Sequence, residues 1–133
     1  MKGKSRSRLL LTLIAISLQL HAVERWVPYR TAGPMDKYID SGSVRVANGV
    51  TSYRVLFNFQ RNSYSTVGSI VFLNEIICGK KLARFVRSAS YSEPYGQGKV
   101  VSEMNAAKFG GDIGKFLPIE SEIENQFQVV CPK

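Results

Sequence analysis

The feature of the sequence that most constrains its fold is a single pair of cysteines, Cys78 and Cys131, 53 positions apart. If the protein folds in an oxidising compartment, an even pair predicts one disulfide. On the chain-entropy estimate such a bond contributes about 4 kcal/mol, a large share of the stability of a small domain. The alternatives are a metal site and a reactive thiol. A metal site would need further Cys or His ligands, and a catalytic thiol would need a base.

The N-terminal segment predicts that the protein is exported. A basic head over residues 1–8 precedes the apolar run Leu9–Leu20 and the small residue Ala22. This is the pattern of a secretory signal peptide, and the apolar run is shorter than the ~20 residues of a membrane-spanning helix. We expect residues 1–22 to be removed, which leaves residues 23–133 as a single domain. Cleavage after Ser17 and an uncleaved N-terminal anchor are the alternatives.

Removal of this segment would halve the net charge. It takes away four of the 18 basic residues and none of the 10 acidic ones, so the charge falls from +8 to +4. A nucleic-acid partner is therefore not expected. A mildly basic exported protein would still be attracted to anionic lipids and acidic glycans.

The composition argues against an enzyme. The only histidine, His21, falls within the predicted signal peptide, so the remaining chain cannot build a Ser-His-Asp, Cys-His or His-zinc site. The acidic residues are scattered, and the group at Glu120, Glu122 and Glu124 is typical of the solvated start of a helix. Since a phosphate-binding glycine loop is also missing, we expect neither a cofactor nor a metal.

The fold class expected from the remaining pattern is α+β, mainly β: an antiparallel sheet with one short C-terminal helix and one disulfide. Asn48-Gly49 is the strongest hairpin signal. A β-branched run within 66–78 predicts an interior strand, while 82–89 fits a helix or, better by its position, an antiparallel strand. The predicted strands are 25–30, 43–47, 50–59, 66–78, 82–89 and 99–103, with a possible register fault in 50–59 and a turn at 40–42.

The end of the chain predicts the helix. The Ser121–Glu124 segment has the S-x-x-E form of a capping box, and Pro118 lies just upstream. We expect a helix over about Glu122–Gln128, with Ile123 and Phe127 facing the core.

A basic cluster is the first candidate binding surface. It consists of Lys80, Lys81, Arg84 and Arg87. In a regular strand, Lys80 and Arg84 would share one face and Lys81 and Arg87 the other, so the four would not form one patch. The alternative is a solvated strand edge that discourages aggregation.

An aromatic loop over residues 91–98 is the second candidate. It carries Tyr91 and Tyr95 together with Gly96 and Gly98. Tyrosines on a glycine-containing loop can serve as contact anchors, or they can fold back onto the core.

The order of these signals resembles the surface-adhesin protein E family of bacterial envelope proteins, from Trp26 to Cys131. The resemblance rests on Tyr38-Ile-Asp40 with Ser43-Val44, an apolar strand ending at Cys78 with basic residues after it, the loop YSEPYGQGKVV at 91–101, and a Pro118/Ser121 helix start before Cys131. It implies an antiparallel sheet with a packed C-terminal helix and one disulfide. It also implies an envelope location and binding of host extracellular-matrix and plasma proteins. The adhesin that names the family is lipid-anchored at an N-terminal cysteine, which this chain lacks.

We therefore expect an exported, non-catalytic binding module in the periplasm or at the cell surface. Its partner would be a protein or an acidic glycan, and an exposed sheet edge could support a homodimer. The alternative is a soluble periplasmic protein, either stress-related or an inhibitor of cell-wall-degrading enzymes, with no host ligand.

Overall fold

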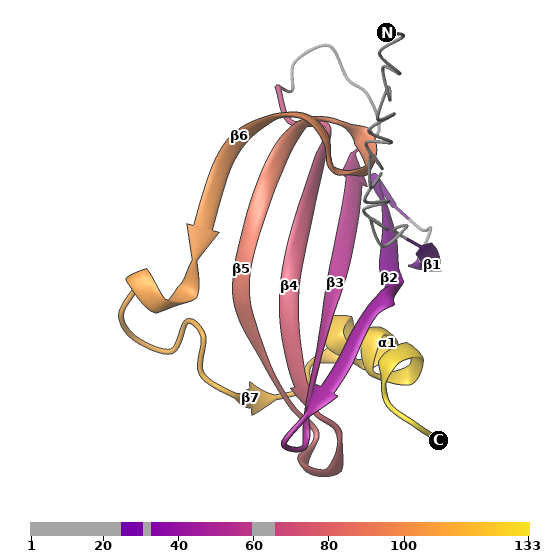
Figure 1. Ribbon diagram of the computed structural model, residues 1–133, viewed down its shortest axis with the longest axis vertical. Helices are drawn as coiled ribbons and strands as arrows, with labels where there is room; N and C mark the ends of the chain where they lie inside the picture. Colours follow the sequence, from indigo (N-terminus) through magenta and orange to yellow (C-terminus); the bar gives the residue numbers. More distant parts are fainter. Residues whose placement is uncertain (1–24, 31–32, 60–65) are drawn as a thin grey trace, which may run out of the picture.

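The fold is a curved antiparallel β-meander with one α-helix against one of its faces (Figure 1). The computed structural model describes residues 25–30, 33–59 and 66–133. Strands β1 to β6 lie side by side in chain order, and the short β7 pairs with β5. Their bounds are β1 Trp26–Arg30, β2 Met35–Ala47, β3 Val50–Phe59, β4 Ser69–Ile77, β5 Leu82–Glu93, β6 Gln97–Asn105 and β7 Leu117–Pro118. The predicted mainly-β class and antiparallel sheet are confirmed.

Helix α1 (Ser121–Val130) packs near β1 and β2 and defines the helix face of the sheet. The core lies between them. Its buried residues from the sheet are Ile39, Tyr53, Val55 and Ile76, joined by Val130 and Cys131 from the end of the helix region. We call the opposite side of the sheet the open face.

The predicted disulfide between Cys78 and Cys131 is confirmed. Cys78 follows β4 directly and Cys131 follows α1 directly, and their Cα atoms are 5.7 Å apart. Cys131 is buried in the core. The bond therefore ties the end of the helix to an interior strand.

The β2–β3 hairpin forms as the sequence predicts. Asn48 and Gly49 both have positive φ, 53° and 76°, as a type I′ turn requires. The pairing of β3 with β4 is uninterrupted, so the predicted register fault in 50–59 is wrong. The irregularity lies in β2 between Asp40 and Arg45, and the predicted turn at 40–42 is a bulge inside one long strand.

The helix begins differently from its prediction. Glu120 is the N-cap, and its main-chain carbonyl accepts hydrogen bonds from the amides of Ile123 and Glu124. No side chain caps the helix, so the predicted capping box at Ser121 is wrong. Glu122, in the first turn of the helix, pairs with Lys37 at 2.7 Å and Arg30 at 3.1 Å. The sequence pattern does not reveal these contacts between strand and helix. Ile123 and Phe127 pack on the core as expected.

The predicted signal peptide, residues 1–22, lies outside the described residues. Among the residues that the structure describes, no helix is both long and apolar enough to cross a membrane.

Candidate binding site

A β-bulge in β5 determines which way its arginines point. Leu73 of β4 pairs with Arg87, but the next residue, Asn74, pairs with Phe85, so Val86 is an extra residue in β5. Positions three apart in a regular strand face opposite sides, and the extra residue cancels this alternation. Arg84 and Arg87 therefore both point to the open face, and the expectation that they lie on opposite faces is wrong.

The register then aligns arginines across the sheet. Arg54 of β3 and Arg87 of β5 both pair with Leu73, one from each side. Since neighbouring strands are about 4.8 Å apart, the two arginine backbones lie about 10 Å apart. The next row is apolar: Leu56, Val71 and Ala89. The open face thus has an apolar floor beside a row of arginines.

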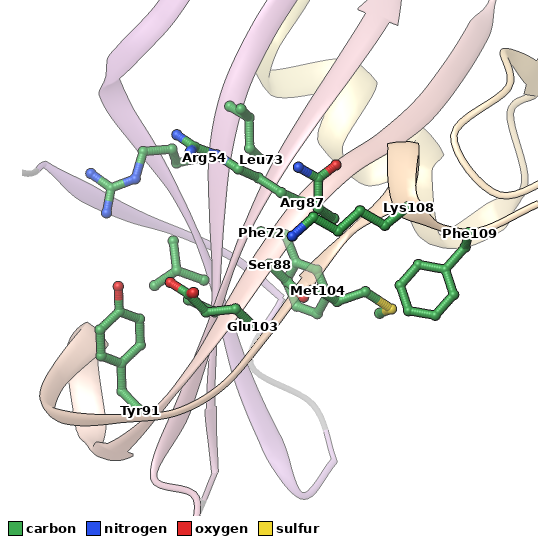
Figure 2. Close-up of a pocket in the computed structure, with 13 residues that line it drawn as sticks. Arg54, Phe72, Leu73, Arg87, Ser88, Tyr91, Glu103, Met104, Lys108 and Phe109 are labelled. Atoms are coloured by element: carbon green, nitrogen blue, oxygen red, sulfur yellow. The ribbon is translucent and has the colours of Figure 1, made fainter.

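This surface is hollowed into a cavity of about 660 Å³, which we call the open-face groove. In Figure 2 the Arg87 side chain extends over Leu73 toward Arg54, and Lys108 reaches toward the same region. Lys108 belongs to the short 3₁₀ segment η3 (Ala106–Lys108) that follows β6. The lining residues are Arg54, Val71, Phe72, Leu73, Arg87, Ser88, Ala89, Tyr91, Glu103, Met104, Asn105, Lys108 and Phe109.

Positive charge dominates the groove. Three cations, Arg54, Arg87 and Lys108, face one carboxylate, Glu103. The Arg54 guanidinium lies 3.4 Å from a carboxylate oxygen of Asp40 and 5.4 Å from the centre of the Trp26 ring. Within the described part of the chain, no carboxylate lies within ion-pairing distance of Arg87 or Lys108.

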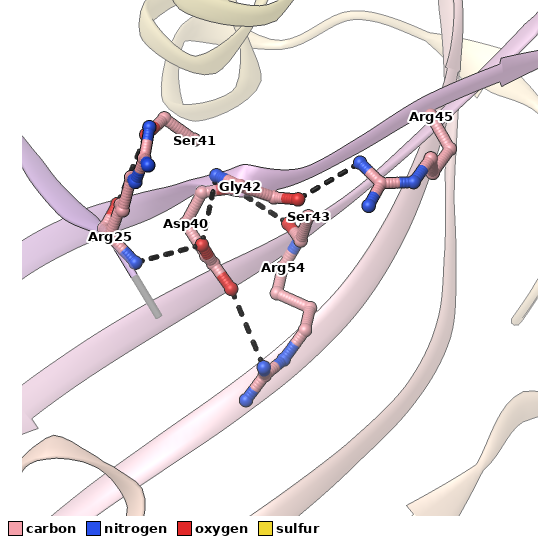
Figure 3. Close-up of polar contacts among 7 residues, drawn as sticks. All are labelled: Arg25, Asp40, Ser41, Gly42, Ser43, Arg45 and Arg54. Carbon is pink, nitrogen blue, oxygen red and sulfur yellow. Dashed lines mark hydrogen bonds and ion pairs between the residues drawn. The ribbon is translucent and has the colours of Figure 1, made fainter. Parts of the chain in front are cut away.

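Asp40 holds Arg54 in place (Figure 3). The Asp40 side chain is buried, and its Oδ1 accepts hydrogen bonds from the backbone amides of Arg25 at 3.1 Å and Gly42 at 3.0 Å. The Ser43 hydroxyl donates to the Asp40 carbonyl and accepts from the Arg54 amide. The register of β2 with β3 places Asp40 directly opposite Arg54, and the bulge that follows Asp40 supplies the Gly42 and Ser43 hydrogen bonds that hold this pair.

The other predicted basic residues lie elsewhere. Lys80 is exposed in the 3₁₀ segment η1 (Cys78–Lys80), and the Lys81 ammonium lies 5.5 Å from the Phe127 ring on the helix. Arg84 pairs with Glu75 at 2.6 Å and lies 4.4 Å from the Phe116 ring centre. Of the predicted cluster, only Arg87 lines the groove. Lys80 and Lys81 lie in the 3₁₀ turn before β5, and Arg84 pairs with Glu75.

The predicted aromatic loop lies against the open face, and of its residues only Tyr91 lines the groove. Strand β5 continues to Glu93, and the 3₁₀ segment η2 (Pro94–Gly96) then lies on the open face. The Tyr95 amide donates to Asn58 Oδ1 at 2.8 Å and the Gly96 amide to the Ser69 hydroxyl at 2.9 Å. These bonds anchor the loop on the sheet.

The two tyrosines of this loop have different surroundings. Tyr91 lines the groove, while the ring of Tyr95 lies 5.8 Å from that of Tyr38 and is 47% exposed. The hydrogen bond with Tyr95 raises the pKa of Tyr38 to about 12. The Tyr38 phenol is therefore a neutral hydrogen-bonding group at physiological pH.

Gly98 of the loop has a backbone conformation and close neighbours that leave no room for a side chain. Gly98 has a φ of +80°, and a Cβ atom there would collide with the Ser92 hydroxyl and the Glu93 side chain. We expect Gly98→Ala to lower the free energy of unfolding by about 2 kcal/mol, measured by urea denaturation. Gly110→Ala is the control, because its Cβ would meet nothing within 4 Å. Equal stability of the two variants would contradict this role.

The arrangement is suited to binding. Among the described residues, no three His, Cys, Asp or Glu side chains gather where they could hold a metal ion. Cations beside an apolar floor can hold an anionic group and an apolar group together. Sequence reasoning missed Arg54, Glu103 and Lys108 as site residues. The hairpin at Asn48-Gly49 was a signal for placing Arg54, but no signal located the bulge at Val86.

Comparisons with known proteins agree with this architecture. The chain matches solved structures of Haemophilus influenzae protein E. In crystal form II the match covers 83% of this chain and 96% of that one, at 20% identity and a TM-score of 0.55. For protein E from non-typeable Haemophilus influenzae it covers 82% of each chain, at 19% identity and a TM-score of 0.53. At this identity the likeness concerns the fold alone. No curated protein matches the chain by sequence. The family model described as surface-adhesin protein E matches residues 26–132, and the chain therefore belongs to the surface-adhesin protein E family.

Proposed function

We propose that the protein is an exported, non-catalytic binding module of the bacterial envelope that attaches to a host extracellular-matrix or plasma protein through the open-face groove. The observation that carries this proposal is the pair of cations, Arg87 and Lys108, beside an exposed apolar surface. Membership of a surface-adhesin family supports the location and the class of partner. In this proposal residues 1–22 direct export and residues 23–133 form the binding domain.

A second candidate function is a periplasmic role without a host ligand. Strand β6 ends the sheet and all nine of its residues are exposed, which fits either a homodimer or an envelope partner. The two functions differ in where the protein is found.

Protease treatment of intact cells separates these two functions. A surface protein is digested while a periplasmic control protein is spared, and a periplasmic protein is protected until the outer membrane is broken. We expect digestion in intact cells. Protection would overturn the adhesin proposal and favour the periplasmic role.

Binding to immobilised matrix and plasma proteins then tests the groove. Because reversing a charge adds repulsion to the lost attraction, we expect Arg87→Glu to weaken binding at least tenfold, about 1.4 kcal/mol. Lys80→Glu makes the same charge change on an exposed residue outside the groove. It is expected to alter binding less than twofold. Equal losses in the two variants would mean that net charge, and not the groove, governs binding.

A further inference from the structure

We propose that the open-face groove binds an extended acidic peptide segment of the partner, with carboxylates at Arg87 and Lys108 and an apolar side chain on the groove floor. This inference rests on the proposed binding function and specifies the chemistry of its ligand. It concerns the open-face groove alone and does not involve Lys80 or Lys81.

The cations of the groove differ in how far their charge is balanced inside the protein. Arg54 is engaged by the buried carboxylate of Asp40, so its charge is largely balanced inside the protein. Arg87 is exposed, and no acidic partner for it or for Lys108 exists among the described residues. In Figure 2 the Arg87 side chain runs past Leu73 toward Arg54, and the Lys108 amine points toward the stem of Arg87. Two cations that line one hollow without an acidic partner among the described residues favour an anionic ligand, and a guanidinium pairs with a carboxylate through two parallel hydrogen bonds.

An exposed apolar surface lies beside those cations. Phe109 is 50% exposed and Met104 is 40% exposed, and both line the groove together with Leu73 and Val71. Exposed large apolar side chains gathered around a hollow mark a binding surface more often than scattered ones do. A ligand that used only its charge would leave this surface exposed to water.

The charge and shape of the groove favour a peptide over other anionic ligands. Glu103 lines the same groove and would repel a uniformly negative chain such as a sulfated glycan. The groove is also concave, whereas the surface of an anionic membrane is flat. A peptide can place carboxylates at the cations, a neutral residue beside Glu103 and an apolar side chain on the floor, because neighbouring side chains of an extended chain point in different directions.

Fluorescence anisotropy with the exported protein and two labelled peptides tests the proposal. The acidic probe is GEFEGDLEG and its matched neutral analogue is GQFQGNLQG. We expect the acidic peptide to bind at least tenfold more tightly than the analogue at low salt, and to lose about fivefold in affinity at 0.3 M salt, since salt screens exposed charges. Heparin serves as the probe for an acidic glycan.

Variants locate the binding. Arg87→Gln and Lys108→Gln are each expected to weaken binding of the acidic peptide about tenfold, because each variant loses the charge that pairs with a carboxylate of the peptide. Phe109→Ser should weaken the peptide several-fold and leave any heparin binding unchanged. Lys80→Gln, in the exposed turn after β4, should leave both unchanged.

Three outcomes would overturn the proposal. Equal affinity for the two peptides would remove the carboxylates from recognition. Heparin binding that depends on Arg87, with no binding of the acidic peptide, would assign the groove to a glycan. An equal effect of Lys80→Gln would indicate diffuse attraction. If host-protein binding depends on Arg87 but the acidic peptide does not bind, the proposed function stands and only this ligand class is wrong.

Discussion

The double variant C78A/C131A is expected to unfold with a free energy about 4 kcal/mol below that of the native protein. The Cys78–Cys131 bond spans 53 residues, and without it the unfolded chain regains the conformational freedom of that loop. The loss is large because small domains have a net stability of only about 5–15 kcal/mol. Urea denaturation of both proteins under oxidising conditions measures it.

A reducing agent provides the control for this result. It should lower the stability of the native protein by a similar amount and leave the double variant unchanged, since the variant has no bond to reduce. If the two oxidised proteins unfold at the same urea concentration, the disulfide contributes nothing to stability. The prediction would then be wrong.

Gln126→Leu is expected to lower the free energy of unfolding by about 3 kcal/mol. Gln126 is 1% exposed and connects the helix to three strands. Its Oε1 accepts hydrogen bonds from the Tyr53 hydroxyl at 2.7 Å and from the Asn74 amide at 3.3 Å. Its Nε2 donates to the Tyr29 hydroxyl at 3.1 Å. Leucine would leave these buried polar groups without their partner.

Gln128→Leu is the matched control, because Gln128 lies two residues further along the same helix. It is exposed, and among the described residues its side chain bonds only to Glu124 at the surface, so we expect a change below about 0.5 kcal/mol. A loss in Gln126→Leu as small as that of the control would show that the network does not hold the helix. The readout is again the free energy of unfolding in urea.

The tyrosines of this network remain hydrogen-bonding groups over a wide pH range. Burial raises the pKa of Tyr29 and of Tyr53 well above the ordinary value. A raised pKa means that this stabilisation is complete below about pH 10 and is lost as the pH rises further. The network therefore contributes no change in stability around neutral pH.

Much of the fold could be predicted because its signals are local. Asn48-Gly49 located a hairpin turn that needs positive φ at both positions, and both residues have it. The capping box failed for a physical reason. Glu120, one residue earlier, is the N-cap, and the Glu124 carboxylate of the predicted box accepts a hydrogen bond from the Gln128 side chain within the helix.

The candidate site could be predicted only in fragments. Arg87 came from the basic cluster and Tyr91 from the aromatic loop, two segments that the sequence treats as separate. The bulge at Val86 and the register of three strands bring them to one groove together with Arg54. A bulge depends on how two strands pair, so the sequence of one strand does not reveal it.

By itself, the sequence determined the antiparallel strands, the disulfide partners and the C-terminal helix, because alternation, turn residues and a lone cysteine pair act over short distances or leave one choice. The tertiary structure alone decided which cations face the groove and that Gln126 would join the helix to the sheet. These features depend on contacts between residues far apart in the chain. Their geometry exists only once the strands are in register and the helix is docked.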